Sequence, residues 1–342
     1  MSALAPAAAV TGSTTEKLVS VIIPVYQGER FIVGAVRSAL NQTHRTLEVW
    51  VVDDGSTDKT LERLATIDDP RLHVLRQANA GTAAARNAAI AQAQGEYFAF
   101  LDSDDRWFPQ KIATELAILQ AAPEPIGIAY SAHYAVDEQG RLLHEAPVRR
   151  HVGNAYDLML DGEDFLMPSL CLFDRRIFDA VGLFNAQCFH EDYDFIIRAT
   201  RHFPIYPTGS RLAVYRQTTG GKCRSILHDY ERAREEELAL VRELAPAFTP
   251  DEAARLRNNT LRSLYLRFLM YDFQENAKRL APEVDFTGLH GSTKGRLGLL
   301  FAKTGINLIA PARRGVQAFH RRTRQGWWRR HLAASRLELR YE

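Results

Sequence analysis

The chain of 342 residues has 46% hydrophobic and 25% charged residues, a globular composition that excludes a largely disordered protein. The formal net charge of +2 is uneven, because residues 291–342 carry twelve Lys and Arg against two Glu, or +10, which leaves −8 on residues 1–290. Three cysteines without metal-ligand spacing predict a reducing compartment and no structural disulfide.

Residues 1–17 are rich in Ala, Ser and Thr and lack a basic segment, so we expect a disordered leader rather than a signal peptide. No stretch reaches the eighteen apolar residues of a membrane span. These features together predict a cytoplasmic protein, with peripheral attachment to the cytoplasmic face of a membrane as an option.

The first 120 residues alternate between apolar runs and helical patterns, which predicts a parallel sheet with helices on both faces. The expected strands cover residues 19–25, 47–52, 71–75 and 96–101, and the expected helices residues 28–42, 58–67, 81–94 and 109–120. Farther along, we expect strands at 126–134 and 212–215, a strand or loop at 141–151, and helices at 173–181 and 192–201. A helical region over 226–290 and a basic amphipathic segment over 291–342 follow.

Two of the expected strands end in aspartates, at Asp53–Asp54 and at Asp102–Asp105. Open α/β sheets bind ligands at the carboxyl ends of their strands. Carboxylates gathered there repel one another unless a cation lies among them, and oxygen ligands suit Mg²⁺ or Mn²⁺ bound to a phosphate. The pattern predicts a metal–phosphate site. The alternatives are an Asx turn that caps a helix and a solvated acidic loop.

Three further patterns are candidate site residues. Glu191 and Asp192 precede the apolar side of a helix, where one of them could act as a general base, although acids are also favoured in any first helical turn. Arg216 begins a glycine-containing loop that could screen a departing diphosphate or form a plain surface turn. Arg86, in an Ala-rich segment, either binds the nucleotide or is an exposed helical arginine.

Residues 18–119, with the motifs VSVIIPVYQGERF, VVDDGSTDKT, NAGTAAARNAA and YFAFLDSDD in that order, resemble family 2 glycosyltransferases of the GT-A fold. A looser likeness extends to Arg224. The resemblance implies a Rossmann-like α/β domain over 18–225 with a mostly parallel sheet that binds a nucleotide sugar. It also implies an inverting transfer of a sugar from a nucleoside diphosphate, most plausibly a UDP-sugar, to a hydroxyl acceptor, with Mn²⁺ or Mg²⁺.

The resemblance also implies a role for each matching residue. Asp192 would be the base, within an ED motif formed with Glu191, and Asp104 would ligate the metal. The nucleotide sugar would contact Pro24, Tyr26, Asp53 or Asp54, Arg86, Asp102, Asp104 and Arg216.

Two departures from the family's pattern bear on these roles. Gln217–Thr219 stands where relatives often carry a histidine. No QxxRW motif of processive synthases occurs, which favours the addition of one or a few sugars.

Two other classes of protein remain open on the sequence. A sugar-nucleotide nucleotidyltransferase would also use such a sheet, but it would carry a glycine-rich basic loop where Pro24–Gly28 stands. A non-catalytic nucleotide-sugar-binding protein would not require Asp102, Asp104 and Asp192 together.

The basic segment 294–330 places Trp327 and Trp328 among arginines, which is typical of an anionic membrane interface. A lipid-linked or glycan acceptor would make such attachment useful. Packing on the catalytic domain or dimerisation is the second interpretation. Nucleic acid is the least favoured partner, because no nucleic-acid-binding module accompanies the charge.

Overall fold

A computed structural model describes residues 17–124, 126–163, 165–218, 226–286, 293–304, 307, 309–335 and 337. The expected leader lies almost entirely outside the described residues, as do residues 219–225 of the loop after Arg216. The strands are β1 Val19–Val25, β2 Leu47–Asp53, β3 Leu72–Arg76, β4 Tyr97–Phe100, β5 Arg106–Trp107, β6 Ile128–Val136, β7 Leu142–Glu145, β8 Cys171–Asp174 and β9 Ile205–Arg216. The helices up to β9 are α1 Ile32–Leu40, α2 Thr60–Leu64, α3 Thr82–Ile90, α4 Lys111–Ala121, α5 Tyr156–Leu160, α6 Arg176–Val181 and α7 Glu191–Thr200.

The sheet has the order β3-β2-β1-β4-β8-β6-β9-β5, with β7 paired to β6. Strands β1 to β4 are mutually parallel, and Val25 pairs with Asp53 while Ile22 pairs with Phe100. The ends of β1, β2 and β4 therefore meet at one edge, as the sequence predicted. Strand β8 is antiparallel to β4 and β6, whereas β6 and β9 are parallel. The predicted α/β fold with a mostly parallel central sheet is confirmed.

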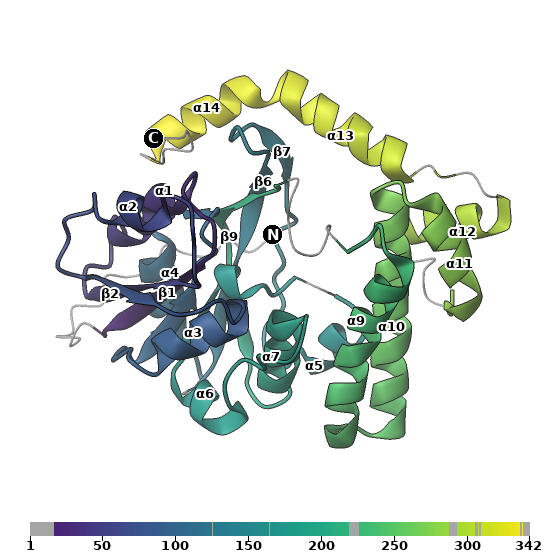
Figure 1. Ribbon diagram of the computed structural model, residues 1–342, viewed down its shortest axis with the longest axis horizontal. Helices are drawn as coiled ribbons and strands as arrows, with labels where there is room; N and C mark the ends of the chain where they lie inside the picture. The colour runs from purple at the N-terminus through teal and green to yellow at the C-terminus, as the bar shows by residue number, and fades with distance from the viewer. Residues whose placement is uncertain are drawn as a thin grey trace, which may run out of the picture.

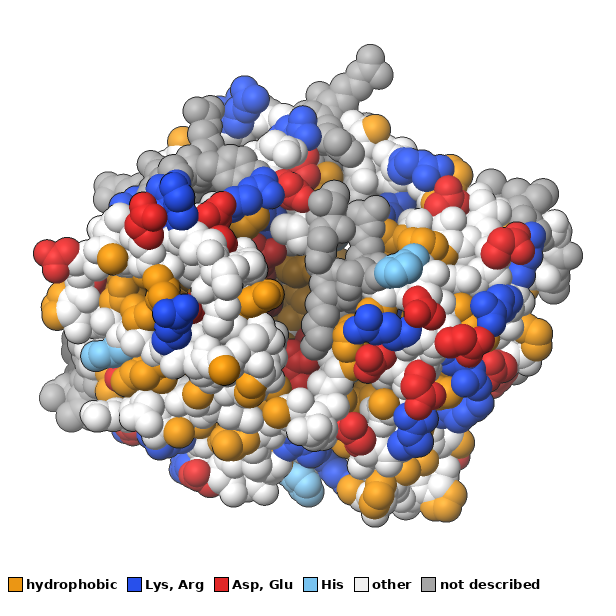
Figure 2. Space-filling view, viewed as in Figure 1, with side chains coloured by type: hydrophobic (Ala, Val, Ile, Leu, Met, Phe, Trp, Pro, Cys, Tyr) orange, Lys and Arg blue, Asp and Glu red, His pale blue; other side chains and the backbone are white. Residues whose placement is uncertain are grey.

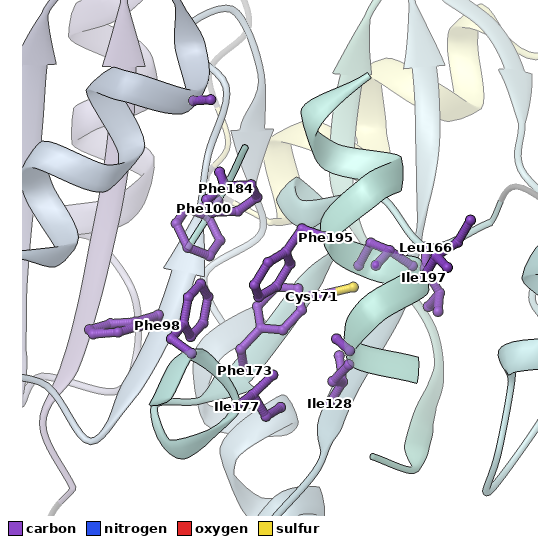
Figure 3. Close-up of a cluster of buried hydrophobic side chains, with 14 of the residues drawn as sticks. Phe98, Phe100, Ile128, Leu166, Cys171, Phe173, Ile177, Phe184, Phe195 and Ile197 are labelled. Atoms are coloured by element: carbon purple, nitrogen blue, oxygen red, sulfur yellow. The ribbon is translucent and has the colours of Figure 1, made fainter. Parts of the chain in front are cut away.

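Helices cover both faces of the sheet (Figure 1). On one face, α1 packs on β1 and β2, α2 packs on α1, and α4 packs on β6, β8 and β9. On the other, α3 packs on β1 and β2, while rings of α6 and α7 pack on β4 and β8. Phenylalanine rings dominate this second core (Figure 3), and Phe195 of α7 lies 4.6 Å from Phe178 and 5.7 Å from Phe173, ring centre to ring centre. The core therefore fixes α7, and with it the acids at its N-terminus.

Some sequence predictions about the middle of the chain were wrong. Strand β8 covers residues 171–174 and takes the first two residues of the helix expected over 173–181, of which Arg176–Val181 is helical. Helical periodicity could not reveal β8, because its four residues are stabilised by pairing with β4, about seventy residues earlier. Strand β9 runs from Ile205 rather than from residue 212, because its first half pairs with β6.

The C-terminal region is helical. Its elements are α9 Tyr230–Leu244, α10 Pro250–Met270, α11 Gln274–Leu280, α12 Thr293–Thr304, α13 Ile309–Thr323 and α14 Gln325–Ala334. Helices α9 and α10 stand beside the sheet domain, and α13 and α14 arch back over it towards α1 (Figure 1). We call α13 and α14 the C-terminal strap. Within the described residues, no helix is both long enough and apolar enough to cross a bilayer.

The strap packs on the sheet domain. Trp328 is only 1% exposed, donates its indole N–H to the carbonyl of Gly140 at 3.1 Å, and shares an apolar cluster with Phe108 and Tyr134. The packing interpretation of the basic segment therefore applies to Trp328. Arg329 and Arg330 are exposed beside it, so attraction to an anionic surface stays a prediction for that side of α14.

Candidate functional site

A cavity of about 600 Å³ lies at the carboxyl ends of β1, β2 and β4. Tyr26, which follows β1, lines this cavity and is 54% exposed, so its ring is accessible to a ligand there. We call this space the donor cavity. Five of the residues expected at the nucleotide sugar line it: Pro24, Tyr26, Asp54, Asp102 and Asp104.

The two aspartates at the end of β2 differ in their surroundings. Asp53 is fully buried, accepts the N–H of Ser56 at 3.1 Å and lies 3.4 Å from Arg76. Asp54 lines the donor cavity and accepts the N–H groups of Ala80 and Gly81 at 2.8 and 2.9 Å. Asp53 therefore stabilises the turn, as the Asx-turn alternative expected, and Asp54 is the one of the pair that can meet a ligand.

The second acidic cluster is electrostatically strained. Burial, and next the negative charge of Asp102, raise the pKa of Asp104 to about 6. Burial and both neighbouring aspartates raise the pKa of Asp105 well above its usual range, and its carboxylate accepts the N–H of Arg216 at 2.8 Å. A cation beside Asp104 would relieve this repulsion.

The residues present fit a divalent cation held partly by its substrate. No group of three or more His, Cys, Asp or Glu side chains is arranged to hold a metal among the described residues. Mg²⁺ and Mn²⁺, however, are commonly held by one or two carboxylates together with substrate phosphates. Asp104, with Asp102 beside it in the donor cavity, supplies that kind of donor set.

Arg86 joins the donor cavity to the start of α7. Its side chain is 4% exposed and donates to Asp102 at 3.0 Å, while its other terminal nitrogen lies 3.7 Å from the carboxylate of Glu191. The guanidinium also lies 5.1 Å from the ring centre of Phe184. The exposed-helix interpretation of Arg86 is wrong, because the side chain is buried between two acids of the predicted site.

The three acids in the first turn of α7 are not equivalent. Glu191 faces Arg86 at 3.7 Å, and Asp194 is paired with Arg198 at 2.6 Å. In the part of the chain that the structure describes, Asp192 has no basic side chain within ion-pair distance, and its carboxylate accepts only the N–H of Tyr193, at 2.8 Å. Asp192 is therefore the acid of this turn whose carboxylate pairs with no basic side chain among the described residues.

Asp192 lines a second cavity, of about 290 Å³, which we call the acceptor cavity. Its wall combines residues of α7 and β9 with residues of α9 and α10, including His190, Tyr215, Glu237, Thr260 and Arg267. Figure 2 shows this face of the molecule hollowed between the sheet domain and the helical region. The helices after residue 225 therefore form part of the site rather than an appendage.

Arg216 is placed differently from the prediction of direct nucleotide contact. It is 2% exposed and donates to the carbonyls of Asp104, Asp137 and Glu138 at distances of 2.9 to 3.1 Å. These bonds join the acidic cluster to the β6–β7 turn. Residues 219–225, which include Lys222 of the predicted loop, lie outside the described residues.

Several residues of the site carried no signal in the sequence. Arg30, Phe31, Thr82 and Glu138 line the donor cavity, and Glu237, Asn259, Thr260 and Arg267 line the acceptor cavity. The first group comes from loops and helix starts, and the second from helices that only tertiary folding brings to the sheet edge. Gly55 could have been singled out, because its φ of +81° and a backbone nitrogen 2.9 Å from where a Cβ would lie require glycine.

The fold and the donor cavity define an α/β protein with a cavity at the carboxyl ends of its parallel strands, the place where such sheets bind ligands. The sequence model of glycosyl transferase family 2 matches residues 20–182. An uncharacterised glycosyltransferase of Haemophilus influenzae is 31% identical over 183 residues, covering 53% of this chain and 70% of the relative. The chain belongs to glycosyl transferase family 2, and it transfers a sugar from a nucleotide-sugar donor.

Two further relatives extend the comparison. An uncharacterised glycosyltransferase of Rickettsia prowazekii is 28% identical over 277 residues, 75% of this chain and 85% of the relative. The Escherichia coli enzyme UDP-Glc:alpha-D-GlcNAc-diphosphoundecaprenol beta-1,3-glucosyltransferase WfaP is 39% identical over 119 residues, 34% of this chain and 47% of its own.

Solved structures share the fold. Staphylococcus aureus TarS 1–349 in complex with UDP-GlcNAc has a TM-score of 0.57 at 20% identity, covering 89% of this chain and 91% of that chain. The mannosyltransferase PcManGT from Pyrobaculum calidifontis, in complex with GDP-Man and Mn²⁺, has a TM-score of 0.56 at 19% identity, covering 92% and 88%.

Proposed function

We propose that the chain is an inverting glycosyltransferase that moves a sugar from a UDP-sugar to a hydroxyl of a glycan or lipid-linked acceptor. The observation that carries the proposal is the link through Arg86. One end of this guanidinium contacts Asp102 in the donor cavity, and the other faces Glu191, whose neighbour Asp192 lines the acceptor cavity. In this arrangement, Arg86 would hold an acid of the donor cavity and the neighbour of the base in fixed positions relative to each other.

In this proposal the nucleotide lies along Tyr26 and Asp54, whose aromatic and carboxylate groups suit a base. Asp102 meets the ribose, and Asp104 holds the divalent cation. When bound, that cation would stabilise the negative charge on the departing diphosphate. Arg216 does not contact the diphosphate in this proposal. It positions the backbone of the acidic cluster through its bond to the carbonyl of Asp104.

The carboxylate of Asp192 takes the proton of the acceptor hydroxyl as that oxygen attacks the anomeric carbon of the sugar. The bond from this carbon to the diphosphate breaks on the opposite face, and its electron pair leaves with UDP. One such displacement inverts the anomeric configuration. The WfaP relative, whose name includes a UDP-Glc donor and a diphosphoundecaprenol acceptor, supports a UDP-sugar and a lipid-linked acceptor.

Two features weigh against the competing classes. The loop after β1 is Tyr26-Gln27-Gly28, and it lacks the glycine-rich basic pattern of a nucleotidyltransferase. A binding protein without catalysis would have no need of an acid held clear of basic partners in a second cavity, as Asp192 is among the described residues.

Asp192→Asn tests the proposal. UDP and UDP-sugar affinity, measured by calorimetry with Mn²⁺, should stay within twofold of the wild type, whereas UDP release should fall by at least about 100-fold, as general-base loss predicts. Asp179→Asn, on the nearby helix α6, is the control and should leave both quantities unchanged. Persistent transfer in Asp192→Asn would show that the base is another residue.

A further inference from the structure

A buried ionic network joins the helical region to the first turn of α7. Glu237 of α9 is 4% exposed, and one of its carboxylate oxygens accepts from two side chains. One is the Nε2 of His190, at 2.9 Å, and the other is the guanidinium of Arg267 of α10. All three residues line the acceptor cavity together with Asp192.

The carboxylate of Glu237 stays charged throughout the working range of pH. Burial alone would raise its pKa, but the charge of Arg267 and the hydrogen bond from His190 outweigh burial and lower the pKa to about 2. Because a carboxylate only accepts hydrogen bonds, the ring nitrogen of His190 that faces it carries the proton. The direction of the bond is therefore fixed, from His190 to Glu237.

His190 is the residue from which α7 starts. It occupies the N-cap position but caps no N–H with its side chain, so the helix begins without the local bond that usually fixes a first turn. Of the three acids in that turn, Glu191 and Asp194 face Arg86 and Arg198, whereas Asp192 faces no basic side chain among the described residues. The bond to Glu237 supplies from another helix the restraint that the local sequence lacks.

We propose that Glu237 is a positioning residue of the transfer reaction, which holds His190 and thereby fixes the Asp192 carboxylate in the acceptor cavity. The proposal rests on the function proposed above. Reacting groups must be held to within a fraction of an ångström, and a displacement of about 1 Å can cost about 100-fold in rate. Residues 226–270 would then be needed for catalysis even though they lie beyond the family's matched segment at 20–182.

Glu237→Gln tests the inference, because it keeps the shape of the side chain and removes its charge. We expect kcat for release of the nucleoside diphosphate, UDP from UDP-Glc or UDP-GlcNAc and GDP from GDP-Man, to fall at least about tenfold. Donor KM should stay within twofold, because the donor cavity contains no residue of this network. Glu235→Gln, on the same helix in an exposed pair with Arg242, is the control and should change neither quantity.

Two variants of His190 keep the test decisive if Glu237→Gln fails to fold. His190→Gln retains an N–H that can reach Glu237, whereas His190→Ala retains none, and Arg267 still pairs with Glu237 in both. We expect His190→Ala to lose kcat at least about tenfold and His190→Gln to recover most of it. A purely structural role would instead lower the melting temperature and raise donor KM together.

Equal kcat in the wild type, Glu237→Gln and His190→Ala would overturn the inference. Asp192→Asn, measured alongside, distinguishes a failure of the positioning role of Glu237 from a failure of the proposed base. If it is inactive while the network variants are normal, only the positioning role of Glu237 fails. If it is fully active, the proposed base, and with it the proposed mechanism, is wrong.

Discussion

Arg86 offers the most direct test of how the two cavities are coupled. The substitution Arg86→Met keeps an unbranched apolar chain against the rings of Phe100 and Phe184 and removes the guanidinium between Asp102 and Glu191. Both carboxylates then face a buried space without that positive charge. We expect losses of stability and of activity, which are measured separately.

The magnitudes follow from burial. Removing one partner of a buried ion pair costs about 3–5 kcal/mol. The Asp102 side chain is 39% exposed, and water screens its charge. The Arg86–Asp102 pair therefore contributes only about 1 kcal/mol to the loss of stability. The 3.7 Å separation from Glu191 is long for an ion pair, so we place the total loss at the low end of the 3–5 kcal/mol range. We expect the free energy of unfolding to fall by about 3 kcal/mol, and transition-state stabilisation to fall by about 2 kcal/mol, or about 30-fold in kcat/KM.

Urea denaturation followed by tryptophan fluorescence measures the first quantity, and UDP release the second. Arg176→Met is the matched control. Arg176 pairs with Asp174 at 2.6 Å, but it is 54% exposed and lies at the other end of the sheet, so its loss should cost under about 0.5 kcal/mol. Losses in Arg86→Met no larger than in Arg176→Met would refute the reasoning.

Three further predictions concern the strap, the acidic cluster and a buried ion pair. Trp328→Ala should release the strap at a cost of about 3–5 kcal/mol, seen as proteolysis within residues 309–334 under conditions where Trp328→Phe resists. Asp104→Asn should abolish the additional thermal stabilisation that Mn²⁺ gives to the UDP complex, while stabilisation by UDP alone persists; an unchanged Mn²⁺ effect would exclude Asp104 as a ligand. Burial raises the pKa of Glu115 from 4.5 to about 7 despite Lys111 at 2.6 Å. The folded state therefore binds more protons between these values, and stability should fall by up to about 3 kcal/mol as pH rises through them. Glu115→Gln should flatten that slope, and an unaltered slope would contradict the assignment.

The sequence allowed the donor side of the site to be predicted because its signals are local. Each acidic pair directly follows an apolar strand, and parallel strands bring their ends together at one edge. Asp54, Asp102 and Asp104 could therefore be placed before the structure was known. The choice of Asp54 over Asp53 could not be made, since it depends on which carboxylate the loop at residues 77–81 engages.

The acceptor side and the role of Arg216 depend on contacts between distant segments. Glu237 is one of several acids in the charged run ERAREEE, and nothing in that run distinguishes the buried one. Arg216 was expected at the diphosphate, but its donors are taken by carbonyls of a turn about eighty residues earlier. Trp328 lies in a basic stretch typical of a membrane interface, yet the nearest apolar surface is this chain's own sheet. Which of several similar residues is buried or bonded is determined by tertiary contacts, and sequence periodicity does not reveal it.

The strap also sets the order in which the donor cavity can be completed during synthesis. Trp328 and Gln325 bond to Gly140 and Leu142, residues that precede them by 188 and 183 positions. At translation rates of 5–20 residues per second, the β6–β7 hairpin emerges from the ribosome roughly 10–40 s before the helix that covers it. During that interval the turn that carries Glu138, a wall of the donor cavity, lacks its outer support. The hairpin of a nascent chain therefore waits in water, without its apolar cover, until α14 has docked on it.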